Sequence, residues 1–403
     1  MPEQQPRVVL GADPLFQPAT GIGNYTRHLA RNLLASQLVD DLALYANGVV
    51  LQGDTLASLI DTARASPAEQ GTRGSSTHAA VFWSAARTYL ASKGWAVSAY
   101  QTLMPWIDRA RLYPYRGAVF HSPNYLLPPF AGPTVATFHD LSIQRYPELH
   151  PKARVQLLDK RMAEVAQRAS HIITDSALIR REVMDYYQLA PDRVTAIPLA
   201  ADDRFRPRSS HECTPVLASL GLTYRGFLLF SGTIEPRKNI RRICAAYRDL
   251  RDSRRLDVPI IFVGDKGWQS AAEHGDIQDL VARGWAQYLG FVNEQVLATL
   301  YSGARALVFP SLYEGFGLPA LEAQQSHTPV LTSEGSTMAE FASDHDVLVD
   351  PGDTGAIREG MAQLASRGGN DPALASTPKP ADRLSWAQTA AQTAAVYRRI
   401  QLL

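Results

Sequence analysis

The chain has 403 residues, of which 45% are hydrophobic and 20% are charged, and its formal net charge is +1. This length is enough for two hydrophobic cores, because single cores stop growing beyond roughly 250–300 residues. A nearly neutral chain argues against a strongly electrostatic nucleic-acid partner, and we expect none. Its two cysteines, Cys213 and Cys244, are too few for a disulfide framework and lack metal-ligand spacing.

The N-terminal residues lack the basic and apolar regions of a signal peptide. No run approaches the roughly 18 apolar residues that a membrane-spanning helix needs. We therefore expect a cytoplasmic protein.

Short apolar runs rich in β-branched residues alternate with stretches of helical periodicity along the whole chain. This alternation is typical of repeated βαβ units around parallel sheets. The candidate strands are residues 7–11, 42–46, 118–121, 135–138, 171–174 and 194–197 in the first half, and 227–231, 259–263, 286–291, 306–309, 329–332 and 347–349 in the second. Six strands in each half predict an α/β protein with two Rossmann-like domains.

Prolines bracket a polar, charged stretch between Ile197 and Pro207, which indicates the joint between the domains. We therefore predict an N-terminal domain of residues 1–203, a second domain of residues 204–382 and a C-terminal helix within residues 383–403. Residues 65–116 form an insertion in the first domain. Its first part, residues 65–78, has the composition of a mobile loop.

The rest of the insertion, residues 79–116, is aromatic and basic, with one acidic residue, Asp108. Such segments suit contact with an anionic membrane surface or a lipid-linked acceptor. The alternative is that the aromatic side chains pack the insertion onto its own domain. The residues concerned are Phe82, Trp83, Tyr89, Trp95, Tyr100 and Trp106, with Arg87, Lys93, Arg109, Arg111 and Arg116.

The most informative stretch, residues 309–322, follows a candidate strand and leads into a predicted helix. Gly315 and Gly317 allow the backbone to approach a ligand closely, and Pro319 suits the first turn of a helix. The N–H groups at Gly317 and Leu318 would form an anion site at the helix N-terminus.

Two carboxylates border that anion site, Glu314 in the loop and Glu322 about one turn into the helix. A carboxylate accepts hydrogen bonds from several hydroxyls at once, as a sugar or a ribose requires. Seven residues separate them, in a Glu-Gly-Phe-Gly-Leu-Pro context that resembles the Glu-x7-Glu motif of family 4 retaining glycosyltransferases. That resemblance implies the GT-B fold, in which two Rossmann-like domains face each other across a cleft.

Other segments extend the resemblance over nearly the whole chain. Residues 227–240 are similar to the family's second phosphate-binding segment, 289–292 to the strand end that borders the nucleotide base, and 385–397 to the helix that crosses back onto the first domain. Residues 21–25 form a glycine turn at a helix N-terminus, which suits a diphosphate. In the family this loop reaches across the cleft to the donor.

The resemblance assigns roles to individual residues. Glu314 would contact the hexose and Glu322 the ribose. Lys238 would neutralise the departing diphosphate, and His139 would contact the donor hexose, with Asp140 beside it. The implied catalytic residues are His139, Arg237, Lys238 and Glu314. The implied nucleotide-sugar-binding residues are Gly21, Gly23, Asn24, Gly232, Thr233, Phe291, Val292, Gly315, Phe316, Gly317, Leu318 and Glu322.

The chain departs from the family at one position, because Thr233 follows Gly232 where many relatives carry an arginine. Arg237 is the candidate for the missing charge. Asp344 and Asp346 have the spacing of an Asp-x-Asp metal motif, but they precede a terminal strand of the second domain. We therefore expect neither a metal nor another cofactor. The resemblance implies a retaining reaction, in which the protein supports the diphosphate electrostatically and orients the two substrates.

Segments around His139, Lys238 and Trp268 most resemble bacterial mannosyltransferases of O-antigen or exopolysaccharide assembly. We expect GDP-mannose as the donor, with GDP-D-rhamnose as the nearest alternative and UDP-sugars as a further one. The expected acceptor is a glycan on polyprenyl diphosphate. Epimerisation, phosphorolysis and a catalytically silent sugar-nucleotide-binding scaffold are the rival functions.

Overall fold

The computed structural model describes residues 5–16, 21–53, 56, 94–367 and 384–402, with the backbone alone for residues 94–102. Contacts divide the chain into two compact units. One holds Met1–Phe138, Glu164–Ile173 and Ala390–Leu403, and the other holds His139–Ala163 and Thr174–Thr389. The domain boundaries predicted at residues 203 and 382 stay predictions, and the predicted mobile loop of residues 65–78 lies outside the described residues.

The first sheet has seven strands in the order β3-β2-β1-β4-β5-β6-β7. All six strands predicted for the first half are present. The additional strand, β3, pairs antiparallel with β2 after a tight turn at Asn47 and Gly48, whose φ angles are 50° and 80°. The strands are β1 (Arg7–Gly11), β2 (Asp41–Ala46), β3 (Val49–Leu51), β4 (Val119–Ser122), β5 (Thr134–Phe138), β6 (His171–Thr174) and β7 (Val194–Ala196).

The second sheet has six strands in the order β10-β9-β8-β11-β12-β13, and the pairs given for it are parallel. It contains all six strands predicted for the second half. They are β8 (Leu228–Ser231), β9 (Ile260–Val263), β10 (Ala286–Gly290), β11 (Ala306–Phe309), β12 (Val330–Ser333) and β13 (Val347–Val349). The prediction of two Rossmann-like parallel sheets is confirmed.

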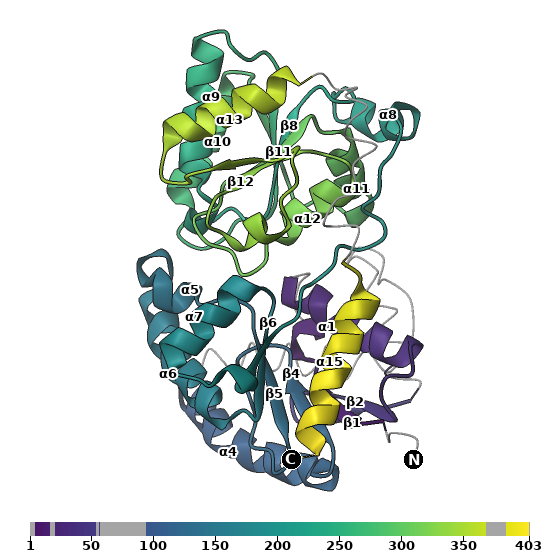
Figure 1. Cartoon of the computed structure of the whole chain (residues 1–403). Helices are drawn as coiled ribbons and strands as arrows, with labels where there is room; N and C mark the ends of the chain where they lie inside the picture. Colours follow the sequence, from purple (N-terminus) through teal and green to yellow (C-terminus); the bar gives the residue numbers. More distant parts are fainter. Residues whose placement is uncertain (1–4, 17–20, 54–55, 57–93, 368–383, 403) are drawn as a thin grey trace. The chain divides into compact units, whose positions relative to one another are not determined.

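Helices connect the strands of each sheet, as the βαβ pattern predicts (Figure 1). The N-terminal half contains α1 (Gly21–Ala35), α4 (Gly94–Leu112), α5 (Ser142–Arg145), α6 (Lys152–Arg168) and α7 (Ala177–Tyr187). The C-terminal half contains α8 (Ser210–Ser219), α9 (Ile240–Asp252), α10 (Ala271–Ala282), α11 (Glu294–Gly303), α12 (Leu318–Gln325), α13 (Thr354–Ser366) and α15 (Trp386–Gln401). No helix of the described part of the chain is long and apolar enough to cross a bilayer.

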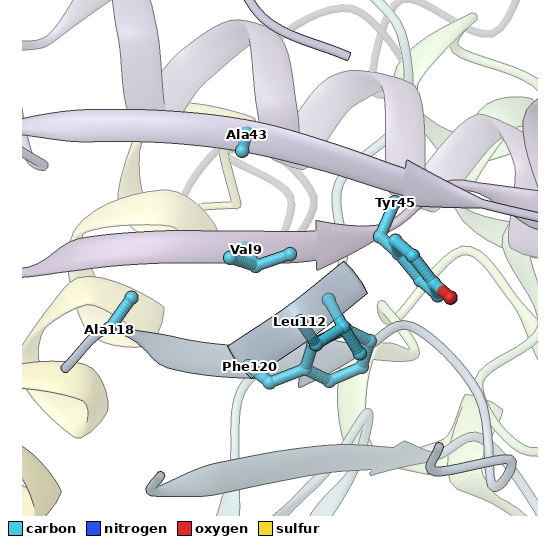
Figure 2. Close-up of a cluster of buried hydrophobic side chains, with 6 residues drawn as sticks. All are labelled: Val9, Ala43, Tyr45, Leu112, Ala118 and Phe120. Carbon is cyan, nitrogen blue, oxygen red and sulfur yellow. The ribbon is translucent and has the colours of Figure 1, made fainter. Parts of the chain in front are cut away.

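One buried cluster joins the end of α4 to the first sheet (Figure 2). Leu112 of α4 packs with Val9 of β1, Tyr45 of β2 and Phe120 of β4, all at most 4% exposed. The rings of Tyr45 and Phe120 meet edge to face, with centroids 6.1 Å apart. The C-terminal end of the predicted insertion is therefore anchored to its own unit.

The C-terminal helix α15, in yellow in Figure 1, is held to the first sheet by a network of buried polar side chains. The Tyr397 hydroxyl lies 2.6 Å from Nδ1 of His121, whose Nε2 lies 2.8 Å from the Thr137 hydroxyl. The Tyr25 hydroxyl of α1 adds a contact of 3.1 Å to Thr137. Because the buried polar side-chain atoms of this four-residue network are paired, the network holds α15 in place on the first sheet.

Candidate active site

The second sheet reverses its strand order between β8 and β11, which are neighbours although they are not consecutive in the chain. Ligands of open α/β sheets bind beyond the carboxyl ends of the strands at such a reversal. The loop after β8 carries Gly232, Arg237 and Lys238, and the loop after β11 carries Glu314 and Gly315. Sheet topology therefore brings together two predicted segments that lie about 80 residues apart in the chain.

A buried ion cluster joins these two loops. Lys238 Nζ donates to Glu314 Oε1 at 2.6 Å, and Arg237 donates to Glu314 Oε2 at 3.1 Å. A second carboxylate, Glu235, accepts from Arg237 at 2.8 Å. Lys238 Nζ also lies 5.0 Å from the centroid of the Phe309 ring. Two cations and two carboxylates thus balance each other in a region where no side chain is more than 13% exposed.

The two cations use their donors differently. Arg237 makes four hydrogen bonds, two to Glu235, one to the Tyr313 carbonyl and one to Glu314. Since a guanidinium has five N–H groups, Arg237 has little left for a ligand. Among the described residues, Lys238 Nζ donates to Glu314 alone. Lys238 is therefore the better candidate to contact a diphosphate, and Arg237 holds the loops in place.

The two glutamates of the Glu-x7-Glu motif have opposite electrostatic environments. Burial works against ionisation of Glu314, but Arg237 and Lys238 outweigh it and lower the pKa of its carboxyl. Burial raises the pKa of Glu322 to about 8, and the nearby Tyr301 hydroxyl opposes this only in part. Glu314 is therefore ionised at neutral pH. The carboxyl of Glu322 is protonated below about pH 8, and hydrogen bonds from ligand hydroxyls would favour its ionised form.

His139 follows β5 and forms, with Asp175, a second polar pair in the same unit. Its Nδ1 lies 2.6 Å from Oδ2 of Asp175, a buried residue directly after β6. The neighbouring positions of β5 and β6 in the sheet bring the two side chains together. A carboxylate on Nδ1 orients the imidazole and leaves Nε2 as the atom directed away from Asp175. Desolvation raises the pKa of Asp175, and His139 opposes that rise.

The Glu314 loop and the His139 segment touch through their backbones. A Cβ placed on Gly315 would lie 1.9 Å from the His139 carbonyl oxygen, so only glycine fits there. Tyr313 strengthens the contact, because its hydroxyl accepts from the Leu141 N–H at 3.1 Å and donates to Glu182 at 2.5 Å. These contacts place His139 close to Glu314, as the predicted shared site requires.

The other predicted binding residues have varied positions. Thr233 is exposed in the loop after β8, and Phe291, after β10, is 56% exposed with Val292 beside it. Phe316 is buried, and Gly317 has a φ of 92° at the start of α12, directly before Leu318. A further group, Gly21, Gly23 and Asn24, occupies the first turn of α1 in the other unit, so its predicted contact with the donor stays a prediction.

Asp346 has a structural role. Its carboxylate accepts from the N–H groups of Val330 and Ser343 at 2.8 and 2.7 Å, and from Gln324 Nε2 at 2.8 Å. Asp346 therefore anchors β12 to the segment before β13. Within the described residues, no group of three or more His, Cys, Asp or Glu side chains is placed to hold a metal ion.

Comparison with known proteins identifies the family. Residues 67–205 match the model of Glycosyltransferase Family 4, and residues 221–375 match that of glycosyl transferases group 1. O-antigen chain mannosyltransferase B of Escherichia coli is 33% identical to the chain over 97% of this sequence and 99% of its own. The chain belongs to the family 4 glycosyltransferases.

Solved structures support the fold of this glycosyltransferase. HepE from Anabaena, in complex with UDP and glucose, has a TM-score of 0.61 at 15% identity, over 97% of this chain and 99% of its own. Sucrose-phosphate synthase from Thermosynechococcus elongatus has a TM-score of 0.66 at 20% identity, over 98% and 99%. Both similarities extend over nearly the whole chain and confirm the predicted GT-B fold.

The sequence analysis missed four residues that the structure adds to the site of the glycosyltransferase. Asp175 orients His139, Glu235 holds Arg237, and the pair Tyr313 and Glu182 ties the loop after β11 to α7. Asp175 had a detectable signal, because it is an acidic residue at the carboxyl end of a correctly predicted strand. Glu235 stands two residues before Arg237, and only its burial distinguishes it from a surface acid.

Gly315→Ala should move the loop that carries Glu314 away from the segment that carries His139. The added methyl group would meet the His139 carbonyl oxygen, so the loop must move and carry Glu314 away from His139. We expect turnover to fall on the order of 100-fold, because a misplacement of about 1 Å costs that much. Gly275→Ala is the matched control, since nothing lies within 4 Å of its added Cβ in α10. Equal turnover in both purified variants would contradict this account.

Proposed function

We propose that the protein is a retaining, metal-independent mannosyltransferase that uses GDP-mannose. Its acceptor is a glycan on polyprenyl diphosphate, in the assembly of a bacterial surface polysaccharide. The observation that carries the proposal is the buried Lys238–Glu314 pair at the strand reversal, where a cation for a leaving diphosphate adjoins a carboxylate for a sugar. The 33% identity to O-antigen chain mannosyltransferase B supports mannose as the sugar.

The leaving group is stabilised by charge that the protein already holds in place. Lys238 is 8% exposed and shares one donor with Glu314, so its other N–H groups can bind the departing phosphate. The N–H groups at the start of α12 add partial positive charge at Gly317 and Leu318. Preorganised charge in a dry site lowers the barrier, because little reorganisation is needed during the reaction.

The anomeric configuration of the sugar is retained when the acceptor hydroxyl attacks the anomeric carbon from the side of the leaving phosphate. The bond from that carbon to the phosphate oxygen breaks, the bond to the acceptor oxygen forms, and the acceptor proton passes to the departing phosphate. His139, oriented by Asp175, and Glu314 then hold the hexose in position. No enzymic nucleophile is needed in this scheme.

The end of β10 favours guanine over uracil. Exposed Phe291 offers a ring for stacking, and Glu294 opens α11 three residues later with its side chain 38% exposed. A carboxylate accepts from the adjacent N1–H and N2–H groups of guanine, whereas the single N3–H of uracil lies between two carbonyl oxygens. Arg204 pairs with Glu294 and holds this carboxylate in place.

Three alternatives differ from this proposal in the donor sugar, in the base of the donor, or in the absence of transfer. GDP-D-rhamnose differs from GDP-mannose by one hydroxyl, and UDP-sugars differ in the base that Glu294 would face. A silent scaffold would bind a nucleotide sugar without transfer. The intact set of Lys238, Glu314 and His139 favours an active enzyme over the scaffold.

A donor panel tests the proposal directly. GDP-mannose should give transfer with the α-configuration of the donor retained, as read by NMR, and excess EDTA should leave the rate unchanged. Lys238→Ala should lower the rate on the order of 100-fold, because it removes charge support for the leaving group. Transfer from UDP-sugars alone, or loss of activity in EDTA with rescue by Mg²⁺, would contradict the donor or the metal-free mechanism respectively.

The pKa of Glu322 predicts a pH dependence of nucleotide binding. Ribose hydroxyls donate to the ionised carboxylate, whereas the free carboxyl has a pKa of about 8. Binding must therefore expel a proton below pH 8, and the affinity for GDP should fall about tenfold for each unit below that value. Calorimetry between pH 6.5 and 9 measures this slope. Glu322→Gln should bind GDP more weakly and lose this part of the slope, and an unchanged slope would refute the assignment.

We also propose that α4 docks the protein on the anionic inner membrane. Leu103, Trp106 and Ile107 project from one side of the helix and are 58%, 71% and 43% exposed. Arg109 and Arg111 flank this apolar side at helical spacing, while the one acidic residue, Asp108, is turned towards the Tyr45 hydroxyl, 2.5 Å away. Apolar side chains flanked by basic ones suit a helix at an anionic membrane surface.

Charge reversal tests this contact. The protein should sediment with vesicles that contain phosphatidylglycerol, less so as salt increases, because each basic side chain contributes about 1 kcal/mol within a Debye length. Arg109→Glu with Arg111→Glu should release it and leave transfer to a soluble acceptor intact. Arg161→Glu with Arg181→Glu, on α6 and α7, is the control and should keep sedimenting. Continued sedimentation of the α4 variant would place the docking surface elsewhere.

A further inference from the structure

His150 is a buried side chain that the proposed mechanism does not use. It follows the short helical turn Pro147–Leu149 and is 3% exposed. Neither Nδ1 nor Nε2 has a hydrogen-bond partner among the described residues. Because buried polar atoms are nearly always paired in folded proteins, two unpaired nitrogens on one ring indicate that something other than this chain binds them.

The ring of His150 is held rigidly by Trp268. The two rings are stacked, with centroids 5.6 Å apart and an interplanar angle of 29°. Trp268 Nε1 donates to the Leu149 carbonyl at 2.8 Å, and the guanidinium of Arg154 lies 4.9 Å from the centroid of the indole ring. These contacts fix the plane of the imidazole but use neither of its nitrogens.

The loop that carries Trp268 is part of the donor site. A Cβ on Gly264 would lie 1.9 Å from the Gly232 carbonyl oxygen, and one on Gly267 would lie 2.7 Å from the Ile234 carbonyl oxygen. The Ile234 N–H donates to the Asp265 carbonyl at 2.9 Å. The loop after β9 therefore packs directly on the loop after β8, to which Lys238 belongs.

His150 also lies near the charged groups of the site. Burial lowers the pKa of its imidazole, and Arg154 and Arg237 lower it further, while Asp140 and Glu148 oppose them. The ring is therefore neutral at pH 7, with one nitrogen as a donor and the other as an acceptor. A hydroxyl can both donate and accept, so a neutral imidazole suits a sugar better than it suits a phosphate.

We propose that His150 is a sugar-binding residue of this glycosyltransferase, whose two ring nitrogens hydrogen-bond hydroxyl groups of a hexose. The inference rests on the proposed function, since that function supplies the hexose. The hexose is the transferred sugar or the terminal sugar of the acceptor, which offer the same hydroxyl chemistry. Trp268 is a positioning residue, because it sets the plane of the imidazole without contacting the sugar.

Substitutions at His150 can separate hydrogen bonding from packing. His150→Phe keeps a ring on Trp268 and removes both nitrogens. Gln and Met have similar lengths but only Gln hydrogen-bonds, so His150→Gln and His150→Met form a second pair in case the Phe variant does not fold. His211→Gln, at an exposed position of α8, is the control for loss of a histidine.

Two measurements distinguish the two sources of the hexose. Calorimetry with GDP-mannose and with GDP isolates the contribution of the transferred sugar. Binding of the acceptor is measured as the KM for an octyl glycoside. The glycoside is the α-mannoside or the N-acetylglucosaminide, whichever the wild type glycosylates. Two lost hydrogen bonds at about 1 kcal/mol each correspond to roughly a 10- to 100-fold change.

If His150 contacts the transferred sugar, the Phe and Met variants should bind GDP-mannose 10- to 100-fold more weakly than the wild type does. Their affinity for GDP should equal that of the wild type. For an acceptor contact, the KM for the glycoside should rise by that factor while donor binding stays unchanged. The Gln variant should lose less than the Met variant in either case. If both constants stay within twofold of wild type in the Phe and Met variants, the inference is wrong. A wild-type protein that neither binds nor uses GDP-mannose would instead refute the proposed function.

Discussion

The buried ion cluster of Glu235, Arg237, Lys238 and Glu314 is the interaction on which the site depends. It joins the loops after β8 and β11, so the same contacts that close the fold also set the positions of the reacting groups. Removing Arg237 would leave the buried Glu235 carboxylate without its cation, and an unpaired buried charge costs about 3–5 kcal/mol. The opposite charges of the cluster balance each other, and Lys238 Nζ donates to Glu314 alone among the described residues, so it keeps donors for the diphosphate of the proposed donor.

Most of the fold could be predicted from hydrophobic runs and their spacing. The six strands proposed for each half are all present, several with the same bounds, because a strand buried on both faces reads as a short continuous apolar run. The missed strand, β3, is only three residues long. Its signal in the sequence is the Asn47-Gly48 pair, which is typical of a tight hairpin turn.

The site could be predicted only where chain-local patterns or the family resemblance applied. Each glycine turn and the Glu-x7-Glu spacing lie within a short stretch of the chain, so they are visible in the sequence. Asp175, Glu182 and His150 acquire their partners through the strand order and the packing of distant loops, which no local pattern encodes. The sequence suggests Arg237 as a charge for the donor, but in the structure its hydrogen bonds are directed to Glu235, Tyr313 and Glu314. The presence of a cation in a motif therefore does not show what that cation binds.

The two ends of the site are built by different physical means. Charge builds the proposed phosphate end, where Lys238 and the N-terminus of α12 offer donors. Contacts to one backbone segment build the proposed sugar end. Gly315 lies against the His139 carbonyl, the Tyr313 hydroxyl accepts from the Leu141 N–H, and Trp268 Nε1 donates to the Leu149 carbonyl. The segment from His139 to His150 is thus held at three points by loops that belong to the second sheet. A sugar is distinguished by the positions of its hydroxyls, so the part that recognises it must be placed more accurately than the part that neutralises a charge.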